Sequence, residues 1–69
     1  MTTKELNDIY YHNDVIEVST RSEAYSAVEA HFGTLKCKSN DEETEKGELW
    51  CVYPPQGVYD NCLYILIKK

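Results

Sequence analysis

The chain has 69 residues, of which twelve are Asp or Glu and seven are Lys or Arg, so its net charge is −5. A chain of this length predicts a single compact domain, residues 1–69, without room for a buried catalytic cleft built from many residues. A surface of this charge repels phosphate backbones. It therefore argues against direct binding of nucleic acid and favours a basic protein partner.

The sequence predicts neither a signal peptide at the amino end nor a membrane-spanning segment. Residues 1–8 lack the apolar segment of a signal peptide, and the longest apolar run, residues 62–67, is too short to span a bilayer. The three cysteines form no Cys-x-x-Cys pair, which is typical of reduced thiols. We expect a cytoplasmic protein that does not bind a membrane.

Residues 2–11 fit two structures. Thr2 and Glu5 are spaced as a helix capping box, and Leu6 and Ile9 then follow at helical spacing. The alternative is a strand, in which residues 9–11 pair with residues 15–18 around a turn, because β-branched and aromatic residues favour strands. We lean toward the helix.

The clearest pattern in the chain predicts a helix over residues 21–32. Thr20 and Glu23 form a second capping box, and Gly33 stands where a left-handed residue would end the helix. Apolar residues recur between them at helical spacing, which predicts one buried face. A strand is expected just before this helix, over residues 15–19, because its residues are largely β-branched.

The remainder of the sequence predicts strands. Residues 34–39 alternate with Leu35 and Cys37 inward, residues 40–47 form a polar acidic loop, and residues 48–53 form an aromatic strand that Pro54 ends. A turn at residues 56–57 leads to an apolar central strand over residues 62–67. The predicted fold is α+β: a small antiparallel sheet of order β-α-β-β-β, with a possible extra element in front and one helix on one face.

Candidate metal ligands and catalytic groups do not fit a known site. The cysteines Cys37, Cys51 and Cys62 could join His12 or His31 around zinc, but their spacing matches no zinc module, so buried thiols are the preferred interpretation. The acidic run lacks the EF-hand pattern for calcium. The sequence predicts no catalytic residue, no metal site and no cofactor.

The acidic run fits either a solvated hairpin loop or a surface for a basic partner. Acids two apart on an extended chain lie about 6.6 Å apart, close to one phosphate step, so Asp41, Glu43 and Glu45 could form such a row. Tyrosines are enriched in protein interfaces because they combine contact area with a hydroxyl group. The predicted partner-binding residues are Asp41, Glu42, Glu43, Glu45, Glu48, Tyr11, Tyr53, Tyr59 and Asp60.

A short acidic chain with one capped helix, residues 20–32, and Tyr-rich strands over residues 35–39, 48–53 and 62–68 resembles the small phage-encoded anti-CRISPR proteins. The likeness is strongest to those that act as DNA mimics on type I surveillance complexes. It is a likeness of type without a shared motif, so it assigns no functional residue. It implies stoichiometric binding to Lys and Arg in a DNA channel, in the host cytosol and without catalysis.

We therefore predict a non-enzymatic acidic inhibitor that blocks the DNA site of a nucleic-acid-binding protein or a CRISPR surveillance complex, acting as a monomer or weak dimer. The first rival is an antitoxin-like or immunity-like module that caps a basic site on a toxin. The second is a small enzyme or metal protein.

Overall fold

The computed structural model describes residues 2–54 and 62–69 of the chain. In chain order its elements are α1 (Thr3–His12), β1 (Val15–Val18), α2 (Arg21–Phe32), β2 (Lys38–Thr44), β3 (Gly47–Tyr53) and β4 (Leu63–Lys68). The predicted α+β class is confirmed. Of the two structures considered for residues 2–11, the chain forms the helix. No helix among the described residues is long and apolar enough to cross a membrane.

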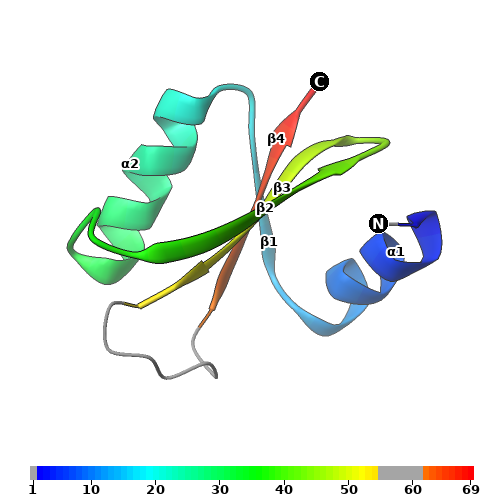
Figure 1. Cartoon of the computed structure of the whole chain (residues 1–69), viewed down its shortest axis with the longest axis horizontal. Helices are drawn as coiled ribbons and strands as arrows, with labels where there is room; N and C mark the ends of the chain where they lie inside the picture. Colours follow the sequence, from blue (N-terminus) through cyan, green and yellow to red (C-terminus); the bar gives the residue numbers. More distant parts are fainter. Residues whose placement is uncertain (1, 55–61) are drawn as a thin grey trace.

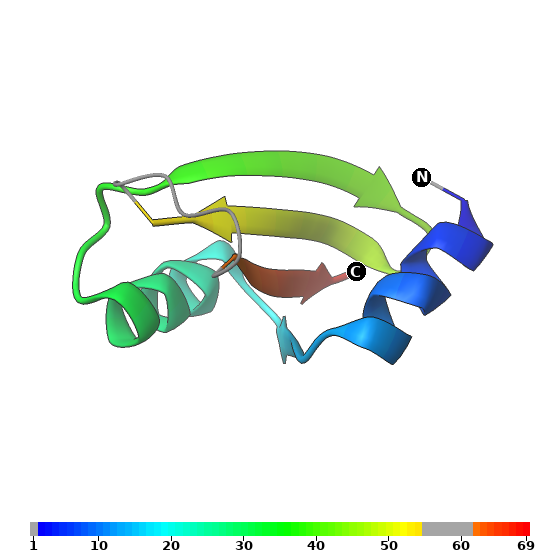
Figure 2. The ribbon, with the colours of Figure 1, turned by 90° about the horizontal axis from the view of Figure 1, so that it is seen from below.

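The four strands form one mixed sheet in the order β1-β4-β3-β2, and Figure 2 shows β2, β3 and β4 side by side. The β2–β3 and β3–β4 pairs are antiparallel, but β1 runs parallel to β4. The prediction of an antiparallel sheet is therefore wrong for this pair. β1 has no hairpin partner and joins a strand far along the chain, so its direction is not encoded in the residues around it.

Both helices begin at the capping boxes that the sequence predicts. The Thr2 hydroxyl accepts the backbone N–H of Glu5 at 3.2 Å, and the Thr20 hydroxyl accepts that of Glu23 at 3.2 Å. Each hydroxyl satisfies one of the backbone donors that a helix leaves free in its first turn. Gly33 ends α2 at φ 75°, the left-handed conformation expected of a carboxyl-terminal glycine.

The two helices lie on opposite sides of the sheet, as Figure 1 shows with the strands between them. On one face, Ala24 and Val28 of α2 pack against β1, β3 and β4. On the other, Leu6 of α1 packs against Leu49 and Leu66. The prediction of one helix on one face therefore missed the second layer. β4 serves both layers because its side chains alternate between the faces, as expected of a central strand.

The bounds of β2 differ from the prediction, and this changes the setting of the acids. The expected strand over residues 34–39 and loop over residues 40–47 are replaced by a strand over Lys38–Thr44 and a turn at residues 45–46. Leu35, expected to point inward, is 52% exposed. The alternation of lysines with Leu35 and Cys37 imitated a strand, whereas backbone pairing with β3 sets the true bounds.

Candidate interaction surface

Part of the acidic run, residues 41–48, lies on β2, the edge strand of the sheet. β2 has one strand neighbour, β3, among the described residues, and six of its seven residues are exposed. Asp41, Glu42 and Glu43 occupy its middle. Acidic residues are uncommon in strands, but an edge strand with both faces in water does not require them to be desolvated. Their charge also discourages pairing with a strand of another molecule.

The register divides these acids between the two faces. Asp41 lies opposite Trp50 and Glu43 opposite Glu48, so both point to the face that carries α2. Glu42 lies opposite Leu49 and points to the face of α1. Because the backbone is extended, Asp41 and Glu43 are about 6.6 Å apart along the strand. Two of the three acids predicted to form a row therefore share one face.

The third acid of that row, Glu45, lies in the turn after β2. Its carboxylate accepts a hydrogen bond of 2.8 Å from the Thr3 hydroxyl of α1. The next residue, Lys46, places its ammonium group 5.1 Å from the centre of the Tyr10 ring, within cation–π range. Glu45 is thus tied to α1 rather than aligned with Asp41 and Glu43.

The same turn is fixed by a threonine and a glycine. The buried Thr44 hydroxyl donates to the Gly47 carbonyl at 2.7 Å and accepts the Lys46 backbone N–H at 3.2 Å. Gly47 has φ +142°, and a Cβ there would collide with the backbone carbonyl of Ile67 in β4. The turn therefore requires glycine at this position, both for conformation and for space.

The Glu48 carboxylate accepts hydrogen bonds from two side chains of the protein. One carboxylate oxygen accepts the Trp50 indole N–H at 2.7 Å, and the other accepts the Arg21 guanidinium at 3.1 Å. These hydrogen bonds lower the pKa of Glu48 below its ordinary value, and the bond from Trp50 has the larger effect. The Glu48 side chain is only 19% exposed, so this predicted partner-binding acid is largely engaged within the protein.

The predicted tyrosines do not gather around Asp41 and Glu43. Tyr11 is 85% exposed, but it lies on α1, on the opposite side of the sheet, with its ring edge-on to His12. Tyr53 lies opposite Lys38 on β2. Tyr59 and Asp60 are outside the described residues. The structure therefore does not bring the predicted set together on one surface.

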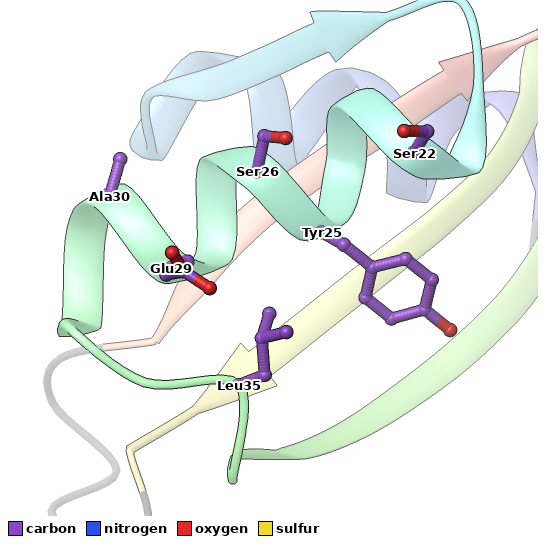
Figure 3. Close-up of a pocket in the computed structure, with 6 residues that line it drawn as sticks. All are labelled: Ser22, Tyr25, Ser26, Glu29, Ala30 and Leu35. Atoms are coloured by element: carbon purple, nitrogen blue, oxygen red, sulfur yellow. The ribbon is translucent and has the colours of Figure 1, made fainter.

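A groove that sequence reasoning missed lies beside α2. It has a volume of about 590 Å³ and is lined by Ser22, Tyr25, Ser26, Glu29, Ala30 and Leu35, which we call the α2 groove. Figure 3 shows Tyr25 projecting from α2 over the neighbouring strands, and Leu35 rising from the loop below the helix. Tyr25 is 53% exposed. The sequence could have indicated this exposure, because Tyr25 lies beside the buried helix face formed by Ala24 and Val28 and not within it.

The cysteines divide between the faces. Cys37 packs against the α2 layer, and its thiol donates to the Thr34 carbonyl at 3.6 Å. Cys51 lies opposite Tyr64 on the other face, and burial raises the pKa of the Cys62 thiol and of the Tyr64 hydroxyl nearby. A raised thiol pKa means less thiolate and low reactivity. No group of three or more metal-ligating side chains occurs within residues 2–54 and 62–69.

Searches of protein-family models, of curated proteins and of solved structures find no match to this chain.

Proposed function

We propose that this protein is a non-enzymatic acidic inhibitor that binds a nucleic-acid-binding protein and occupies its DNA site. The observation that carries the proposal is the exposed edge strand β2, on which Asp41 and Glu43 share one face at about 6.6 Å spacing while Glu42 occupies the other. That spacing is close to the step between phosphates along a nucleic-acid strand, so lysines and arginines arranged for phosphates can meet these carboxylates.

The net charge of the whole chain also favours a basic protein partner. A net charge of −5 on 69 residues attracts basic surfaces over a distance, speeds encounter and repels DNA itself. The partner we propose is the basic DNA channel of a nuclease or CRISPR surveillance complex in the host cytosol, to which the protein binds as a monomer. Inhibition then requires only occupancy, and no chemical step on the partner.

The central experiment is competition for the captured partner. The tagged protein is used to isolate its partner from host lysate, and duplex DNA is then titrated into the purified complex. We expect DNA and the protein to exclude one another, and we expect affinity to fall steeply as salt rises. A partner that binds DNA and the protein at once would contradict the proposal and favour the immunity-like alternative.

A charge-reversal variant tests the acidic strand itself. Asp41→Lys, Glu42→Lys and Glu43→Lys made together should abolish partner binding, since reversing several charges changes the whole local field. Each single Ala variant should lose little, because exposed charge contacts are worth about 0.2–1 kcal/mol each. The matched control carries Asp8→Lys, Asp14→Lys and Glu17→Lys, with circular dichroism to check folding. Equal loss in both triple variants would assign the effect to net charge, not to β2.

A further inference from the structure

The α2 groove combines exposed apolar surface with a fixed aromatic ring. Tyr25 and Leu35 are 53% and 52% exposed, and both line the groove and the smaller hollow of about 40 Å³ beneath it. The Tyr25 ring packs edge-on against Trp50, with ring centres 5.2 Å apart. This contact holds the ring in place before any ligand binds, which reduces the entropy lost on binding.

The polar groups around the α2 groove select a cation. Glu29 contributes a carboxylate on the side of α2 near Leu35, and Ser22 and Ser26 contribute hydroxyls (Figure 3). Neither hollow has Lys, Arg or His among its described lining residues. Ser39 lines the inner hollow, and Asp41 follows two residues later on the same face of β2. The Arg21 guanidinium interacts with both Asp41 and Tyr25, so the uncompensated negative charge of the groove is that of Glu29.

Arginine fits this combination better than lysine. Its planar guanidinium can stack on the Tyr25 ring and form paired hydrogen bonds with the Glu29 carboxylate, while its aliphatic stem covers Leu35. A lysine ammonium is a compact, strongly hydrated charge that gains less from an aromatic wall. A second copy of this chain is a poor source, because its single arginine, Arg21, is already paired with Glu48.

We propose that the α2 groove binds an arginine side chain of a basic protein partner. This inference rests on the proposed function and adds to it an anchor point distinct from β2. The volume of about 590 Å³ lies within the range of roughly 300–1,000 Å³ typical of ligand sites, so the groove has room for one long side chain with adjacent backbone. Charge on β2 attracts the partner, and the arginine fixes how it is seated.

The test uses two peptides of equal charge, N-acetylated hexa-arginine amide and hexalysine amide, titrated into the isotope-labelled protein and followed by NMR. We expect hexa-arginine to bind about threefold or more tighter, a difference typical of a cation–π contact at an exposed site. Backbone signals of Tyr25, Glu29 and Leu35 should shift most. Glu29→Gln and Tyr25→Leu should each weaken hexa-arginine binding about threefold and remove the preference over hexalysine.

Asp8→Asn is the matched control, since it removes one exposed negative charge on α1 and should leave the preference for arginine unchanged. The inference is overturned if the two peptides bind equally, if neither binds, if the shifts centre on Asp41–Glu43, or if Glu29→Gln behaves like Asp8→Asn. None of those results would decide the proposed function, which the DNA-competition experiment tests separately. Conversely, arginine binding in the groove without competition by DNA for the captured partner would defeat the proposed function alone.

Discussion

Glu43 lies directly opposite Glu48 across the β2–β3 pair, so two carboxylates face each other on the same side of the sheet. Directly opposed side chains have Cβ atoms about 4.5–5.5 Å apart, a distance at which like charges destabilise a sheet. Arg21 pairs with Glu48 at 3.1 Å, and Glu43 lies outside that ion pair.

Replacing Glu43 should therefore stabilise the protein. Glu43→Gln removes the repulsion and should raise the free energy of unfolding at neutral pH by about 0.2–1 kcal/mol, measured by urea denaturation. Glu42→Gln is the control, because Glu42 lies opposite Leu49 and should give no gain. If Glu43→Gln is less stable than the wild type, the two carboxylates do not repel each other significantly.

Glu48 should make stability depend on acid pH. Its folded-state pKa lies below the ordinary value of 4.5, chiefly because Trp50 and Arg21 donate hydrogen bonds to the carboxylate. The ionised form therefore stabilises the fold above pH 4.5, and this contribution is lost as pH falls through the lowered folded-state pKa. Glu48→Gln should melt lower than the wild type at pH 7, and the gap should narrow as pH falls from 4.5 to 3. A constant gap across this range would show that the charge of Glu48 is not responsible.

The two left-handed glycines should differ sharply in their tolerance of a methyl group. Gly47→Ala places a Cβ against the Ile67 carbonyl, so its cost should reach the upper end of the usual range of about 0.5–3 kcal/mol or exceed it. A Cβ added at Gly33 would meet nothing within 4 Å, so Gly33→Ala should show only backbone strain of about 1 kcal/mol. Thermal melting of both variants makes the comparison. Equal losses would mean that β4 moves to accept the methyl group.

The cap of α2 should contribute a measurable part of the stability. Thr20→Ala removes the side-chain acceptor for the Glu23 N–H and should cost about 1 kcal/mol. Ser22→Ala, an exposed change in the first turn of the same helix, should cost little or nothing. Urea denaturation followed by circular dichroism measures both. No loss in Thr20→Ala would indicate that Glu23 finds another acceptor.

Features governed by neighbours in sequence could be predicted, and features governed by distant contacts could not. The threonine caps of both helices and the Gly33 terminus are local signals, and all appear in the structure. The glutamate of each capping box instead accepts from the threonine hydroxyl. The parallel β1–β4 pair joins segments about fifty residues apart, for example Val15 with Tyr64, and no local pattern specifies it. The strand state of Asp41–Glu43 likewise depends on pairing with β3, which overrides the weak strand propensity of acids.

The candidate site shows the same division. The acidic character and exposure of residues 41–43 follow from their identity, so they could be named from the sequence. The α2 groove could not, because Tyr25 and Leu35 meet only after the chain turns at Gly33 and returns below the helix. Nor could the engagement of Glu48, which depends on Arg21 being brought alongside β3.

The central position of β4 has a consequence for synthesis on the ribosome. Ile65 and Leu66, both fully buried, complete the two opposite core layers, yet β4 is made after the other helices and strands among residues 2–54 and 62–69. The β2–β3 hairpin can form early because its contacts are local, but neither helix has its full packing surface until β4 is made. The nascent chain therefore stays largely unfolded until that point. Mutual repulsion between its acidic residues would help to keep such incomplete chains from associating.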